Sequence, residues 1–112
     1  MSKLPEEYLK HIFDEAVYLI NTSSDINEDN FAKSETLQRA FARSLEIIGE
    51  AVKNLPEEYK SKNSELDWKS VAGMRDKLIH HYFGVDYEIV WDVVKNEIPK
   101  LKLDIEKLIN VK

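Results

Sequence analysis

The chain has 112 residues, no cysteine and a net charge of −5, which limits it to one domain and excludes disulfide bonds and thiolate metal sites. With 43% hydrophobic and 33% charged residues, it has the composition of a soluble globular protein, and its acidic balance argues against nonspecific binding to duplex nucleic acid. It contains neither a signal peptide pattern nor an apolar run of about 18 residues, so a cytoplasmic protein with no membrane contact is expected.

The first half of the chain predicts two long helices separated by a polar loop. Apolar residues recur at helical spacing after Pro5, which suits a first helical turn, so a helix is expected over residues 5–21. Residues 21–30 are rich in Ser, Asp and Asn and predict a loop. A second apolar stripe predicts a helix over residues 34–54, in which Gly49 suggests the close approach of another helix or of a second subunit.

The next segment predicts a short turn followed by a third helix. Pro56 ends the second long helix, and residues 57–62 are expected to form one turn. Asp67 is the expected N-cap of a helix that starts at Trp68, and Gly84 is its expected C-terminal stop.

The C-terminal part predicts a fourth helix that is bent or split. Asp86 is its expected N-cap, and Pro99 is expected to interrupt or kink it before a last helical segment. Its expected core residues are Ile89, Val90, Val93 and Val94. The last helix is expected to continue to the C-terminus through Leu101, Leu103, Ile105, Leu108 and Ile109. Strand-like alternation and internal repeats are absent from the sequence. We therefore predict an all-α single domain over residues 1–112, an antiparallel bundle of four to five helices.

Residues 75–82, Arg-Asp-Lys-Leu-Ile-His-His-Tyr, concentrate the chemically capable side chains. Histidine moves a proton near neutral pH and arginine holds phosphate charge, which together suit metal-free phosphodiester chemistry. Asp76 and His80 are four residues apart and share a helical face, so the aspartate can orient the imidazole. Arg75 and His80 are about 140° apart on a helix. Either the arginine reaches around, or the helix loosens near its end, or two copies meet and complete each other's sites.

Other roles for these residues remain open from the pattern alone. Arg75 can pair with an acid while His80 and His81 are simply polar residues at a helix end. A metal site is not expected, because adjacent helical residues point about 100° apart and the sequence has no further Cys or His cluster. Arg39 and Arg43 leave room for a local basic site despite the acidic balance.

Residues 75–82 match the R-x4-H-x-Y motif of the HEPN superfamily, and their surroundings resemble the HepT-type toxins of MNT/HepT toxin–antitoxin modules. The resemblance covers nearly the whole chain and is most specific over residues 44–99. It implies a HEPN-like α-helical bundle that dimerises, with the two motifs facing each other in a composite cleft. It also implies a metal-independent endoribonuclease without a cofactor, acting as the toxin of a type VII toxin–antitoxin system.

The same resemblance assigns roles to individual residues. Arg75 and His80 are the implied catalytic pair, and Asp76 is the implied supporting residue. Tyr82 is the implied acceptor of AMP from a cognate MNT-type nucleotidyltransferase antitoxin, so the expected partners are RNA, this antitoxin and a second copy of the chain. Two other hypotheses remain: a non-catalytic helical partner of a nucleotidyltransferase, which the acidic balance favours, and a structural dimerisation domain.

Overall fold

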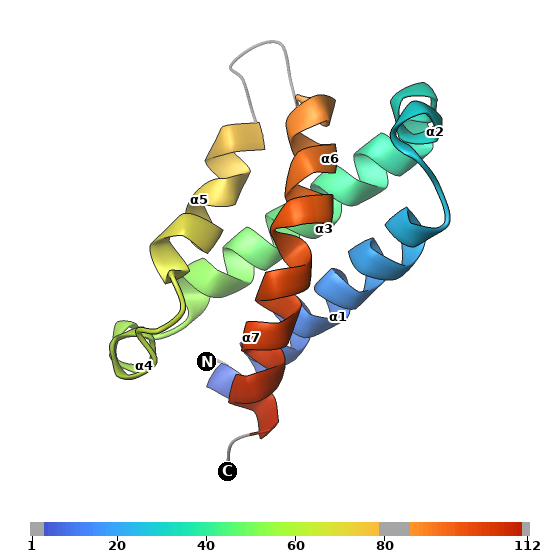
Figure 1. The fold of residues 1–112 in the computed structure, drawn as a ribbon. Helices are drawn as coiled ribbons and strands as arrows, with labels where there is room; N and C mark the ends of the chain where they lie inside the picture. Colours follow the sequence, from blue (N-terminus) through green and yellow to red (C-terminus); the bar gives the residue numbers. More distant parts are fainter. Residues whose placement is uncertain (1–3, 79–85, 111–112) are drawn as a thin grey trace.

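The computed structural model describes residues 4–78 and 86–110, and within these ranges it contains helices and no strand. Figure 1 shows the described helices, which are α1 (Pro5–Ser24), α2 (Glu28–Lys33), α3 (Glu35–Asn54), α4 (Glu57–Lys62), α5 (Trp68–Leu78), α6 (Tyr87–Asn96) and α7 (Ile98–Asn110). The predicted all-α fold is confirmed. Two short helices and a split fourth helix account for the larger number of elements. In the described part of the chain, no helix is long and apolar enough to cross a membrane.

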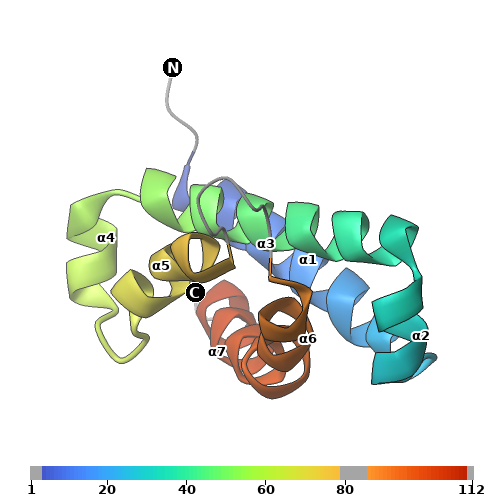
Figure 2. The same ribbon diagram turned by 90° about the horizontal axis from the view of Figure 1, so that it is seen from above.

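The helices form two layers. α1 and α3 run antiparallel and contact each other extensively, while α7 packs on α1 and α5 packs on α3. Figure 2 shows α5, α6 and α7 on one side of α3, with α2 and α4 at the two ends of α3. The long central helices are thus covered mainly from one side by the C-terminal half of the chain.

The core lies between α1, α3 and α7. Its fully buried side chains include Ile12 and Leu19 on α1, Phe41 and Ile48 on α3, and Ile105 on α7, each 0% exposed. Full burial of side chains of this size stabilises the fold by about 1.5–3 kcal/mol each. The buried residues of α1 and α3 recur at helical spacing, as the sequence pattern predicted.

Two apolar residues of α7 are exposed. Leu103 is 55% exposed and Ile109 is 37% exposed. The buried residues on either side of Leu103 are Leu101 and Ile105. Leu103 is two residues from each of them, so it lies about 200° around the helix and points away from the core.

The predicted loop over residues 21–30 is wrong in part, because α1 continues to Ser24 and α2 begins at Glu28. Asn27 caps α2: its Oδ1 accepts from the backbone N–H of Asn30 at 2.8 Å, and Asn30 Oδ1 accepts from the N–H of Asn27 at 3.1 Å. Polar residues that are typical of loops here satisfy helix ends instead.

α2 also carries an aromatic residue into the core. Phe31 is 1% exposed, and its ring centre lies 5.0 Å from that of Phe41 and 5.3 Å from that of Trp91. These tilted aromatic contacts join α2 to α3 and α6. Tertiary packing of one side chain thus stabilises a helix too short to be stable alone.

The interruption expected at Pro99 occurs two residues earlier. α6 ends at Asn96, Glu97 is the residue between the helices, and α7 begins at Ile98. Proline lacks the N–H that a helix interior needs, but in a first turn this group has no intrahelical partner anyway. Pro99 is therefore placed in the first turn of α7, and the break precedes it.

Candidate functional site

The predicted motif lies at the junction of α5 and α6, whose adjoining ends are at the same end of the molecule (Figure 1). The backbone of Arg75 and Asp76 belongs to the C-terminal half of α5. Asp76 is exposed. The side chain of Arg75, together with His80 and Tyr82, lies outside the described residues, as does the helix stop expected at Gly84. The structure therefore places the two helices that frame the motif, and the roles of its side chains stay predictions.

Both framing helices are capped by the aspartates that the sequence indicated. Asp67 Oδ1 accepts from the backbone N–H of Ser70 at 3.0 Å and begins α5. Asp86 Oδ1 accepts from the N–H groups of Glu88 at 3.1 Å and Ile89 at 3.3 Å and begins α6. Each cap satisfies N–H groups that a helix start leaves without partners. α6 therefore has a defined start close to the motif in the chain.

α5 is fixed to the rest of the molecule along one side. Trp68 and Met74 are buried and Val71 is partly buried, and through this side α5 packs on α3. The opposite side is open: a methyl group added at Gly73 would meet no atom within 4 Å. A mid-helix glycine costs about 1 kcal/mol relative to alanine. Because no described neighbour occupies the space beside it, the surface of α5 at Gly73 is accessible to another molecule.

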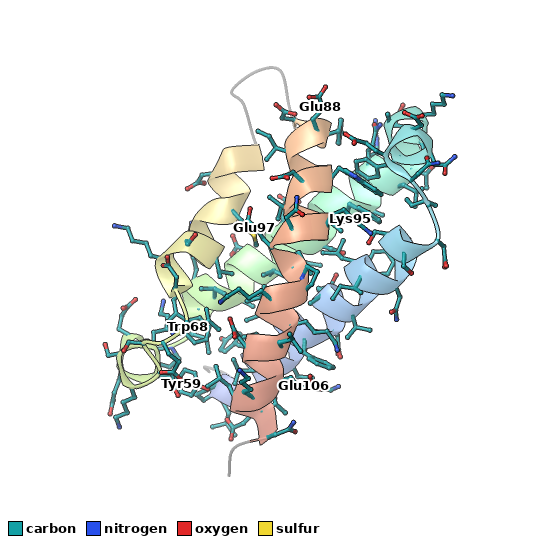
Figure 3. The ribbon with its side chains drawn as sticks, viewed as in Figure 1. Tyr59, Trp68, Glu88, Lys95, Glu97 and Glu106 are labelled. Carbon is teal, nitrogen blue, oxygen red and sulfur yellow. The ribbon has the colours of Figure 1, made fainter. Side chains whose placement is uncertain are left out.

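A small cleft lies between α5 and the α6–α7 junction. Its volume is about 200 Å³, and its charged lining residues are Asp67, Glu97, Lys100 and Asp104. Lys100 Nζ lies 3.0 Å from Asp104 Oδ2, so the only described cation in the lining is already paired. Figure 3 shows Glu97 on the α5 side of this junction. The carboxylates give the cleft a negative balance, which disfavours an RNA phosphate.

The arginines of α3 do not form a free basic patch in the described part of the molecule. Arg39 Nη2 lies 2.6 Å from Glu35 Oε1, and Arg43 Nη1 lies 3.8 Å from Glu46 Oε1. These are exposed ion pairs within one helix, in which the carboxylates offset the positive charge. Any RNA contact by these arginines thus requires exchange of partners.

The sequence did not predict the small cleft between α5 and the α6–α7 junction, nor the groove that α4 forms with the ends of α1 and α7. Both are built from segments that are distant in the chain, so no local pattern announces them. Among the described residues, no three His, Asp or Glu side chains gather closely enough to hold a metal ion.

Comparison with known proteins gives a consistent result. The family model described as "Ribonuclease HepT-like" matches residues 7–108. The chain is 51% identical over 107 residues to "Putative RNase TTE0752" of Caldanaerobacter subterraneus subsp. tengcongensis, covering 96% of each protein. It is 47% identical over 102 residues to "Putative RNase MJ0127" of Methanocaldococcus jannaschii, covering 91% of this chain and 84% of the relative.

A third relative carries the family name itself. The chain is 42% identical over 108 residues to "Probable ribonuclease HepT" of Thermococcus cleftensis, covering 96% of this chain and 98% of the relative. No solved structure matches the chain.

Proposed function

This chain belongs to the ribonuclease HepT-like family, and from that premise we propose that it is a metal-independent endoribonuclease. We further propose that it acts in the cytoplasm as the toxin of a type VII toxin–antitoxin system. The observation that carries the proposal is the extent of the family match. Residues 7–108 include the whole Arg75–Tyr82 motif and both helices that frame it.

In the proposed reaction, the ribose 2′-hydroxyl of the RNA attacks the adjacent phosphorus. His80 takes the proton of this hydroxyl or protonates the leaving 5′-oxygen, and Arg75 stabilises the negative charge of the transition state. The phosphorus–5′-oxygen bond breaks, leaving a 2′,3′-cyclic phosphate on one product and a 5′-hydroxyl on the other. The 2′-hydroxyl is the internal nucleophile, so the substrate is RNA and not DNA.

A second copy of the chain would complete the site. On a continuous helix, Arg75 and His80 point about 140° apart, so the motifs of two copies can present an arginine and a histidine to one phosphate more directly than one helix can. The open surface of α5 at Gly73 allows close approach of another helix. Two copies related by a two-fold axis near α5 would then form a composite cleft from both motifs.

Tyr82 would be the site of control. It follows His80 by two residues, so AMP attached to its hydroxyl adds negative charge and bulk beside the catalytic pair. Both effects oppose the approach of an RNA backbone. A cognate nucleotidyltransferase that transfers AMP to Tyr82 would thereby act as the antitoxin.

The first test is RNA cleavage by the purified full chain. His80→Ala should lower the cleavage rate by about 10²–10⁴-fold, since it removes a general acid or base. His11→Ala is the matched control, because His11 is exposed on α1 and its loss should leave the rate unchanged. Arg75→Ala, compared with Arg39→Ala, tests the phosphate-binding role. Asp76→Asn should lower the rate less than His80→Ala, because it removes a supporting charge and not the proton carrier.

The outcome decides between two functions. Cleavage by His80→Ala at the wild-type rate would contradict the assignment of a ribonuclease site to this motif. A chain that cuts no RNA but binds a nucleotidyltransferase through Arg75 and His80 would instead be the non-catalytic partner module, which the net charge of −5 favours.

The control by AMP is tested separately by intact mass after expression with the nucleotidyltransferase. The wild-type chain and Tyr18→Phe should gain AMP units and lose cleavage activity, whereas Tyr82→Phe should gain none and keep cutting. Tyr18 is 38% exposed and is therefore a fair control for an accessible tyrosine. Modification of Tyr82→Phe at the wild-type level would place the acceptor elsewhere.

A further inference from the structure

An open groove lies at the end of the molecule away from the α5–α6 junction. It is formed by the first turns of α1, by α4 with the segment that follows it, and by the last turns of α7, which come together at one end in Figure 1. Its volume is about 1200 Å³. Pockets for small molecules usually measure about 300–1,000 Å³ and enclose their ligands, so this groove is large for such a ligand.

The lining of the groove is largely apolar. Leu9 is buried at its base, and Phe13 and Leu108 are partly buried. Leu4 is 65% exposed and Ile109 is 37% exposed at the same groove. A single exposed apolar side chain is ordinary, but several gathered in one concavity indicate a surface that another molecule covers.

The groove also has an excess of negative charge. The charged residues that line it are four acids and two lysines: Glu6, Asp14, Glu65, Glu106, Lys10 and Lys107. Lys10 Nζ lies 3.5 Å from Asp14 Oδ2, so one lysine is already neutralised. A third lysine, Lys102, lies with its Nζ 5.8 Å from the ring centre of Phe13 but does not line the groove. Carboxylates therefore outnumber lysines among the charged residues of the lining.

The wall on the α4 side is held in place by specific contacts. The rings of Tyr59 and Trp68 meet edge to face with centres 6.2 Å apart. Trp68 Nε1 donates to the backbone carbonyl of Asn63 at 3.0 Å, and Asn63 Nδ2 donates to the carbonyl of Tyr59 at 2.9 Å. Figure 3 shows Tyr59 beside Trp68, with Glu106 across on α7. A preformed wall reduces the entropy lost when a partner binds.

The hydroxyl of Tyr59 lies on this wall, near two of the acids that line the groove. Burial raises the pKa of its hydroxyl above the ordinary 10.0, and the negative charges of Glu6 and Glu65 raise this pKa further. The negative charges of these two carboxylates therefore reach a side chain in the wall of the groove. A cation placed there would be attracted by the same field.

We propose that this groove binds an amphipathic helix of a partner protein, with an apolar stripe in the groove and Lys or Arg side chains facing the acids. An apolar groove flanked by charge is the usual receptor for such a helix, and the charge would favour basic over acidic partners. The acids repel RNA and anionic lipid. This inference concerns a surface separate from the motif and does not depend on the ribonuclease reaction.

The test uses the full chain and three synthetic helical peptides of equal length. The first has leucines on one face and lysines on the other, the second has glutamates in place of the lysines, and the third is a scrambled form of the first. Calorimetry should show that only the first binds well, and that its affinity falls as salt is added. The second and third should bind at least about tenfold more weakly.

Matched substitutions locate the binding site. Ile109→Lys should weaken binding of the leucine–lysine peptide about tenfold, whereas Leu103→Lys, at a 55% exposed position of the same helix outside the groove lining, should not. Glu106→Lys should weaken it as well, while Glu88→Lys on α6 should not. RNA cleavage by Ile109→Lys should equal that of the wild-type chain, which separates failure of this proposal from failure of the ribonuclease assignment.

Several results would overturn the proposal. One is equal binding of the lysine and glutamate peptides, and another is equal binding by Ile109→Lys and the wild-type chain. If Ile109→Lys instead dissociates an oligomer in sedimentation experiments without changing peptide affinity, a second copy occupies the groove. Contacts between the groove and the chain's own ends in NMR spectra, together with no peptide binding, would show that the chain fills its own groove.

Discussion

The core between α1, α3 and α7 and the end of the molecule at α5 differ in how many side chains they bury. α3 alone buries seven residues, from Phe41 to Val52, whereas among the described side chains of α5 only Trp68 and Met74 are buried. Burial of apolar side chains therefore stabilises the core between α1, α3 and α7 more than it stabilises α5, which carries the first part of the motif. α5 is held by its N-terminal cap and a single packed side, whereas α6 buries Val90, Val93 and Val94. Functional segments are commonly drawn from such less stable parts of a fold.

The largest effect on the free energy of unfolding is expected for a substitution in the core between α1, α3 and α7. Phe41→Ala should lower the free energy of unfolding by about 3–5 kcal/mol, because it leaves a cavity where a fully buried ring contacted Phe31 and Tyr18. Urea denaturation measures this change. Leu103→Ala, at an exposed position on α7, should change it little. If both substitutions lowered the free energy of unfolding by a similar amount, this core would not be the main source of stability.

A smaller and more local effect is expected at the start of α6. Asp86→Ala removes the acceptor of two backbone N–H groups and should lower the free energy of unfolding by about 0.5–2 kcal/mol. Amide hydrogen exchange should accelerate first in α6 and much less in α3. Asp92→Ala, which removes only the acceptor of an exposed bond from Asn96 Nδ2 later in α6, serves as control. Uniform acceleration throughout the chain would mean that the two regions do not unfold separately.

The open side of α5 gives a prediction of opposite sign. Gly73→Ala should raise the free energy of unfolding of the isolated chain by about 1 kcal/mol, because alanine favours a helix and the added methyl meets no neighbour. In the proposed dimer the same methyl would stand at the contact and weaken association, which sedimentation can measure. Gly49→Ala is the comparison, because Gly49 is a buried glycine within α3. A destabilised Gly73→Ala chain at dilutions where only monomer is present would contradict this view of α5.

The smallest effect concerns Tyr59. Its folded-state pKa is raised above the ordinary 10.0, first by burial and then by Glu6 and Glu65. The folded chain therefore keeps this proton at pH values where the unfolded chain has begun to lose it. The corresponding stability is fully present below the unfolded pKa and is lost as the pH rises through the folded pKa. The difference in tyrosinate absorbance between the wild-type chain and Tyr59→Phe measures the shift, and Glu6→Gln should reduce it. An unshifted titration would contradict the negative field proposed for the groove.

The sequence predicted local features well. The caps at Asp67 and Asp86 are confirmed, because a cap depends on residues within one turn. Residues 57–62, expected to form one turn, form the short helix α4. The loop expected over residues 21–30 is partly wrong because α2 depends on the burial of Phe31 against other helices. For the candidate site, the motif came entirely from the order of residues 75–82. How the side chains of the motif lie relative to one another depends on how the helices pack and, in our proposal, on how two chains associate.

The sequence by itself determined where α5 and α6 begin, which residue types form the motif, and which family the chain resembles, since each of these depends on residues close together in the chain. Only the tertiary structure decided that Leu103 faces outward and that α5 keeps an open side. It also brought residues 4–14, 59–65 and 106–110 together into one groove. These features arise from contacts between distant segments, and such contacts are set by how whole helices pack and not by any local pattern.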